Sequence, residues 1–203
     1  MKNIVVLLTL LVSLLNCAQK KENITLKETK EFQYEMNMEY ADIKTSPLTK
    51  EDFIKFSSLH FFEINEDLRV IASFKRTPEE IPFEMLTTTS RLAKYVTYGV
   101  ATFKINNKEY SLNIYQSTTN TDPEYKNHLF LPFTDLTNNN ESYAGGRFMD
   151  LSLNDITKDH KIALNFNKAY NPYCAYNHKY SCPIPPKENN LDVAINAGVL
   201  KFH

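Results

Sequence analysis

The sequence of 203 residues has no tryptophan and only four glycines. It also lacks a dominant charge sign, since 23 basic residues are balanced by 24 acidic ones and the basic residues form no long run. Proteins that bind nucleic acid usually carry a basic patch or stripe, so this balance argues against a nucleic-acid partner. No specific catalytic, metal or cofactor signature is present. We therefore predict no cofactor and no metal site, and the sequence alone names no reaction.

The first 17 residues have the three parts of an export signal. Lys2 supplies a basic start, and the run from Ile4 to Leu15 forms an apolar core shorter than the roughly 20 residues of a spanning helix. Leu14-Leu15-Asn16-Cys17 then resembles the lipobox of bacterial lipoproteins, although Asn16 stands where Gly, Ala or Ser is more usual. The alternative, a buried N-terminal helix, lacks a capping residue.

This pattern predicts the domain organisation and the location of the protein. We expect a signal peptide over 1–17, lipidation at Cys17, a polar tether over 18–25 and a single domain over 26–203. The lipid would anchor the protein outside the cytoplasm, to the inner or outer bacterial membrane, on the periplasmic or the outward-facing side. No oligomeric state is predicted.

The pattern of apolar residues after the tether predicts a mainly β fold of the α+β class. Apolar residues three and four apart predict a helix from Leu26 to Lys44, and a capping sequence at Thr49 predicts a second, short helix to about Ser57. Alternating or β-branched stretches predict eight strands, over 68–75, 82–88, 101–105, 110–114, 129–133, 147–152, 161–166 and 191–196. We expect an antiparallel sheet that closes into a barrel or a sandwich, with one or two N-terminal helices.

One polar motif concentrates charge in a single loop and strand. Asp135, Glu141, Arg147 and Asp150 lie close together in the sequence. Carboxylates beside a guanidinium can bind a polar ligand or act as acid and base, so Glu141, Arg147 and Asp150 are the catalytic candidates. The alternative is structural, because an arginine paired with acids often only holds a loop in place.

A second motif, near the C-terminus, contains two of the three cysteines. Cys174, His178 and Cys182 are spaced by three residues, and thiolates and imidazole are typical zinc ligands. Three ligands at these intervals match no common zinc pattern. Outside the cytoplasm a disulfide between Cys174 and Cys182 is the favoured interpretation, with free buried thiols as the alternative. Catalysis by a cysteine with a histidine base is not supported by the flanking residues.

The two motifs together resemble a known family. The segments that carry the resemblance are 131–137, 141–151, 164–177 and 180–189, and the likeness extends from Ser46 to Gly198. On these residues the chain is similar to the bacterial family called domain of unknown function 1684. Membership implies no reaction.

Three positions depart from the pattern of that family. Ser142 and Ala144 stand where the family usually has Thr and Gly, and Val199 replaces a carboxylate in the family's typical ending. If that acid is active in other members, its role is lost in this chain.

Polar and aromatic residues of both motifs are candidates for a ligand site. They are Asp135, Tyr143, Asn167, Tyr170, Asn171 and Tyr176. The tyrosines can stack against a ligand or fill the core, and the asparagines can line a pocket or satisfy loop backbone. We expect a binding or accessory module with a polar cleft for a small polar ligand. A hydrolase or lyase that uses Glu141, Arg147 and Asp150, and a structural envelope protein, are the two alternatives.

Overall fold

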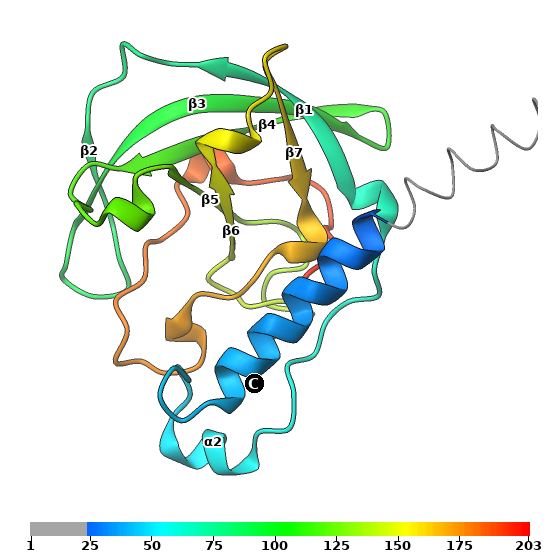
Figure 1. Ribbon diagram of the computed structural model, residues 1–203, viewed down its shortest axis with the longest axis vertical. Helices are drawn as coiled ribbons and strands as arrows, with labels where there is room; N and C mark the ends of the chain where they lie inside the picture. Colours follow the sequence, from blue (N-terminus) through cyan, green and yellow to red (C-terminus); the bar gives the residue numbers. More distant parts are fainter. Residues whose placement is uncertain (1–23) are drawn as a thin grey trace, which may run out of the picture.

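A computed structural model describes residues 24–203 of the chain (Figure 1). The predicted signal peptide, the lipidation site Cys17 and all but the last two residues of the predicted tether lie outside the described residues. Within residues 24–203, no helix combines the length and the apolar character needed to cross a bilayer.

The predicted N-terminal helix is present over residues 24–41. It includes residues 24 and 25, which the sequence placed in the tether, and it ends before Ile43, whose side chain is 76% exposed. Met36 and Tyr40, one turn apart, are buried against the rest of the domain. The second helix, α2 (Lys50–Lys55), begins as predicted, because the Thr49 hydroxyl accepts a hydrogen bond from the Asp52 backbone N–H at 3.1 Å.

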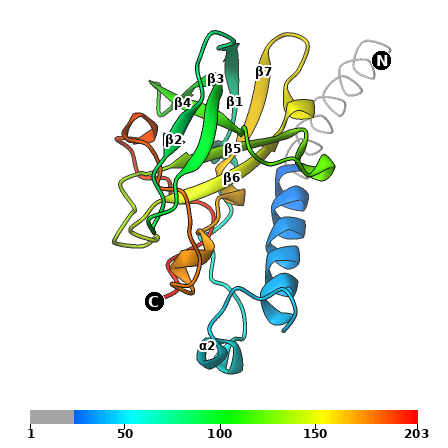
Figure 2. The same cartoon turned by 90° about the vertical axis from the view of Figure 1, so that its left-hand side faces the viewer.

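Seven strands form one antiparallel sheet that curves into a half-barrel (Figures 1 and 2). The strand order is β6-β5-β4-β3-β1-β7, and β2 pairs with β3 beside this path. The strands are β1 (Arg69–Arg76), β2 (Phe83–Met85), β3 (Ala93–Ile105), β4 (Lys108–Ser117), β5 (His128–Phe133), β6 (Arg147–Ser152) and β7 (Lys161–Asn165). Short 3-10 turns occur at η1 (Glu66–Leu68), η2 (Pro123–Tyr125), η3 (Leu153–Asp155), η4 (Phe166–Lys168), η5 (Tyr173–Ala175) and η6 (Lys187–Asn189). Mainly antiparallel β structure with one main N-terminal helix is therefore confirmed.

The predicted strand over 191–196 is wrong, because this segment is irregular. The Leu191 backbone N–H donates to the Thr134 carbonyl at 2.8 Å, and the Ile195 N–H donates to the Asp135 carboxylate at 3.1 Å. These backbone groups thus form their hydrogen bonds with a loop and a side chain instead of with a neighbouring strand. The alternating pattern of apolar residues in this segment is therefore not accompanied by strand pairing.

The hairpin β3–β4 forms at the predicted Asn-Asn turn. Asn106 and Asn107 have φ values of 50° and 64°, in the left-handed region that a two-residue hairpin turn requires and that asparagine tolerates. Earlier in β3, the register of its pairing with β4 shifts between Thr97 and Gly99. A Cβ atom at Gly99 would lie 2.3 Å from the Phe74 ring, so only glycine lets this ring pack onto the strand.

The half-barrel is open between its first and last strands. β6 and β7 lie at opposite ends of the strand order. Tyr170 covers part of the outer edge of β6 through two backbone hydrogen bonds with Phe148, of 2.8 and 3.0 Å. The helix over 24–41 spans the opening, where Thr29 meets Asn165 at the end of β7 (Figure 2). The opening is therefore bounded by β6, β7, the helix and the segment that leads to Tyr170.

Candidate functional site

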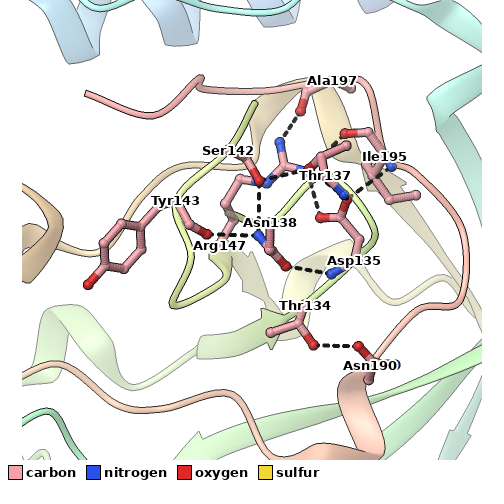
Figure 3. Close-up of polar contacts among 10 residues, drawn as sticks. All are labelled: Thr134, Asp135, Thr137, Asn138, Ser142, Tyr143, Arg147, Asn190, Ile195 and Ala197. Carbon is pink, nitrogen blue, oxygen red and sulfur yellow. Dashed lines mark hydrogen bonds and ion pairs between the residues drawn. The ribbon is translucent and has the colours of Figure 1, made fainter. Parts of the chain in front are cut away.

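Arg147, predicted as a catalytic candidate, is fully buried in an ion pair (Figure 3). Its Nη2 atom lies 2.8 Å from Asp135 Oδ2 and donates to the Ile195 carbonyl, also at 2.8 Å. Nη1 donates to the Ala197 carbonyl. Burial lowers the pKa of Arg147, and the Asp135 carboxylate opposes that shift. Both terminal nitrogens of the guanidinium are therefore bonded to protein groups.

Asp135 is equally engaged. Its Oδ1 atom accepts hydrogen bonds from the Thr137 backbone N–H at 2.9 Å, the Thr137 hydroxyl at 2.7 Å and the Ile195 N–H at 3.1 Å. The pair thus ties the loop after β5, the start of β6 and the irregular C-terminal segment together (Figure 3). This geometry matches the structural interpretation of the first motif, in which an arginine and an acid hold a loop.

The other two catalytic candidates do not join Arg147. Asp150 lies three residues further along β6, so its side chain points to the opposite face of the strand, and its side chain is 54% exposed. The Glu141 residue is exposed on the loop, where its backbone carbonyl accepts from the Lys201 N–H. Glu141, Arg147 and Asp150 therefore do not form the cluster that the sequence suggested.

A cavity of about 450 Å³ lies at the opening of the half-barrel, and we call it the seam cleft. The helix over 24–41 forms one wall with Glu28 and Phe32. The other wall comes from the sheet and its connections: Arg69, Met149, Asp150, Leu151, Asp155, Ala163, Asn165, Lys168 and Tyr170. The cleft thus presents charges of both signs next to aromatic and aliphatic surface, within the size range of small-molecule sites.

Asp150 joins two other side chains at the edge of this cleft. Its Oδ2 atom accepts a hydrogen bond from the Tyr170 hydroxyl at 2.7 Å, and its Oδ1 atom lies 2.8 Å from His128 Nε2. Burial, with the nearby Asp150 charge as the next cause, raises the pKa of Tyr170 well above its ordinary value. Tyr170 therefore stays protonated near neutral pH and serves as a hydrogen-bond donor.

Two cationic side chains lie elsewhere in the lining of the seam cleft. Arg69 Nε is 3.5 Å from Glu28 Oε2 and, among residues 24–203, it is a buried nitrogen without a hydrogen-bond acceptor. Lys168 Nζ lies 5.5 Å from the centroid of the Phe32 ring, within cation–π range. Arg69 is thus paired with Glu28, whereas Lys168 has no acidic partner among residues 24–203.

Comparison with known proteins identifies the family. A family model described as a protein of unknown function (DUF1684) matches residues 54–200. The chain belongs to the DUF1684 family. The solution NMR structure of an uncharacterised protein from Haloarcula marismortui is similar to it, with 28% sequence identity over 89% of this chain and 96% of that chain, and a TM-score of 0.70. No curated protein matches the chain.

The fold of this DUF1684 chain uses most of the predicted binding residues for its own structure. Asn167 clamps Asn65 with two hydrogen bonds of 2.8 Å to its backbone N–H and carbonyl. Asn171, also fully buried, donates to the Leu200 carbonyl at 2.9 Å. Of the six candidates, only Tyr170 lines the seam cleft.

Tyr143 and Tyr176, the other aromatic candidates, also contact protein groups. Tyr176 is buried and packs edge-on against Tyr40, with ring centroids 4.9 Å apart. The Tyr143 hydroxyl lies 4.0 Å from Cys174 Sγ, and burial raises the pKa of Tyr143 to about 12. Both rings therefore fit the interpretation in which tyrosines fill the core and bond at its rim.

Cys174 and Cys182 are both free and buried in the structure, so the predicted disulfide is not present in it. The two side chains are nevertheless neighbours, because the Cys174 backbone N–H lies 3.1 Å from Cys182 Sγ. A hydrogen bond from the Cys182 thiol lowers the pKa of Cys174 and, in the same interaction, raises that of Cys182. The two cysteines are thus reduced neighbours that share a hydrogen bond.

The residues that sequence reasoning missed are mainly those on the helix and at the strand ends. Glu28 and Arg69 belong to no motif, Lys168 lies within the second motif but was not a candidate, and Phe32 was recognised only as part of the apolar stripe. No local signal marks these side chains as a group, since they meet only in the folded chain. In the part of the chain that the structure describes, no group of three or more His, Cys, Asp or Glu side chains is placed to hold a metal ion.

Proposed function

We propose that this DUF1684 protein is an exported, lipid-anchored binding module that holds a small polar ligand in the seam cleft. The observation that carries the proposal is the cleft itself, which places Arg69 and Lys168 opposite acidic residues in a cavity of about 450 Å³. Pockets of this size with a few convergent polar groups are the usual form of ligand sites.

The geometry favours binding over the hydrolase or lyase alternative. That alternative needs Glu141, Arg147 and Asp150 around one cavity. Arg147 is instead enclosed with Asp135, and neither lines the seam cleft. We expect the binding module to use no cofactor and no nucleic-acid partner, in keeping with its balanced charge.

Thermal unfolding of the full chain in detergent tests the binding proposal. Calorimetry is run with separate probes: amino acids, dicarboxylates, phosphate monoesters, sugars and alkylammonium salts. A probe present at 100 times its Kd stabilises the folded state by about 2.7 kcal/mol. For a chain of this size that corresponds to a rise in Tm of roughly 5–10 °C.

A matched pair of variants tests whether a probe binds in the seam cleft. Lys168→Gln changes a lysine that lines the cleft and should weaken the binding of an anionic probe. Lys158→Gln changes an exposed lysine outside the cleft and should leave binding unchanged. If none of the probes shifts Tm, the binding proposal fails and the structural envelope role is favoured.

The anchor has its own test. Cells that express the full chain are grown with labelled palmitate, and the protein should carry label that is lost in the Cys17→Ser variant and retained in Cys174→Ser. Label in neither protein would rule out the lipid anchor while leaving the binding proposal untouched.

A further inference from the structure

A second, smaller pocket of about 140 Å³ adjoins the seam cleft. The two cavities share Phe32, Asp150 and Tyr170, so a ligand can extend from one into the other. The full lining of the small pocket is Phe32, Met36, Glu39, Tyr40, Asp150, Tyr170 and Tyr173. This lining comes mainly from the helix over 24–41 and from the segment around η5, which the helix passes in Figures 1 and 2. Its volume is suited to a head group and is well below the range for whole drug-sized ligands.

Aromatic rings make up most of this lining, and they meet at steep angles. The Tyr40 and Tyr173 rings have centroids 6.4 Å apart and planes inclined by 66°. Phe32 and Tyr170 add two more rings, and Met36 adds a polarisable thioether. The faces of such rings attract cations, and several rings around one point form the usual cage for alkylated ammonium groups.

Two carboxylates give the pocket negative charge. The Tyr173 hydroxyl donates to Glu39, and the Tyr170 hydroxyl donates to Asp150 at 2.7 Å. Burial raises the pKa of both phenols, so both remain donors at neutral pH and hold the carboxylates in place. Glu39 has no ion-pair partner among residues 24–203.

No lysine, arginine or histidine occurs among the described residues that line the small pocket. An anionic group would therefore lie beside two acids, of which only Asp150 has a basic partner, His128, outside the pocket lining. A neutral group would leave the charge of Glu39 unpaired. An organic cation satisfies both the carboxylates and the ring faces.

We propose that the small pocket binds an alkylated ammonium group and that the polar remainder of the same ligand extends into the seam cleft. This inference rests on the proposed function and names the class of ligand. Lys168, in the lining of the seam cleft, has no acidic partner among residues 24–203, so it can meet an acidic part of the ligand.

Calorimetric titration of the full chain in detergent with choline, and with its neutral isostere 3,3-dimethylbutan-1-ol, tests the inference. The two probes have the same shape and differ only in charge. Choline should bind about tenfold more tightly than the alcohol, because the ring faces and the two carboxylates attract only the charged probe.

Two matched pairs of variants locate the site. Glu39→Gln should weaken choline binding roughly fivefold or more. Glu35→Gln, which changes an exposed acid one turn away on the same helix, should change choline binding by less than about twofold, because exposed charges are screened. Tyr173→Leu should weaken choline binding roughly five- to thirtyfold, whereas Tyr34→Leu, which removes an exposed ring on the helix over 24–41, should leave it unchanged. Circular dichroism confirms that each variant is folded.

Each outcome decides the inference. Tighter binding of choline that depends on Glu39 and Tyr173 supports it. Equal binding of choline and the alcohol, or equal effects within a matched pair, overturns it. If choline does not bind but another probe raises Tm in a way that depends on Lys168, the ammonium site is wrong and the binding module stands. If no probe binds, both fail.

Discussion

Replacement of Arg147 by methionine tests whether the first motif is structural. Methionine keeps an unbranched side chain and removes the guanidinium. The change leaves the Asp135 carboxylate buried without its cation, and the Ile195 and Ala197 carbonyls without their donor. We expect Arg147→Met to lower the free energy of unfolding strongly without changing the seam cleft.

The size of the effect follows from these contacts. Breaking a buried ion pair by removing one partner costs about 3–5 kcal/mol. Asp135 keeps three other donors, from Thr137 and Ile195, which places the expected loss toward the lower end of that range. For a chain of this length, 3–5 kcal/mol corresponds to a fall in Tm of roughly 6–20 °C.

Chemical denaturation followed by circular dichroism measures the loss, with two controls. Glu141→Gln changes an exposed acid of the same motif and should stay within about 0.5 kcal/mol of the parent. The double variant Arg147→Met with Asp135→Leu removes both charges, so it should lose less than the sum of the two single changes. A stable Arg147→Met protein that no longer binds a seam-cleft ligand would refute the structural role and make the arginine functional.

Three further predictions concern other sites. Burial raises the pKa of Tyr176 to about 12, above its ordinary value of 10.0. The neutral phenol therefore stabilises the fold below pH 10.0, and this contribution to the free energy of unfolding is lost as the pH rises toward 12. Alkaline titration followed by phenolate absorbance should show the parent protein unfolding as this phenol ionises, and a Tyr176→Phe protein with the same pH dependence of stability would contradict this. Export, as proposed above, would place Cys174 and Cys182 in an oxidising compartment, where they should pass two hydrogens to a small-molecule disulfide and form a bond worth about 2.5 kcal/mol for so short a loop. Alkylation of unreduced, denatured protein should then label neither cysteine, and labelling of both cysteines would contradict the prediction. Gly99→Ala should destabilise by about 1–3 kcal/mol, because its methyl group would meet the Phe74 ring at 2.3 Å; an unchanged denaturation midpoint would show that the ring moves aside freely.

Much of the fold could be predicted because its signals are local. The Asn106-Asn107 turn and the alternation on both sides of it specify the β3–β4 hairpin within a few residues of chain. Thr49 likewise caps α2 within one turn. The segment over 191–196 shows the limit of this reasoning, since its apolar residues alternate but its backbone bonds to a loop that sequence alone does not place beside it.

The candidate site was harder to predict because its members come from distant parts of the chain. Polar density drew attention to Arg147 and Asn167, and both turned out to satisfy buried groups of the protein itself. Asp150 and Tyr170 belong to the two motifs, yet the residues opposite them, Glu28 and Phe32, lie on a helix whose pattern indicated only core packing. Composition within a motif cannot distinguish a side chain that holds a loop from one that faces a cavity.

The helix over 24–41 meets the sheet through side chains, as where Thr29 contacts Asn165, and its residues lie before the matched segment 54–200. In the proposed ligand site, the sheet and its connections supply one wall and the helix supplies the other. Substitution of a few residues on one helical face, such as Phe32 or Glu39, can change which molecule is accepted without altering any strand pairing. A change of ligand preference in the proposed site therefore needs no change in the half-barrel.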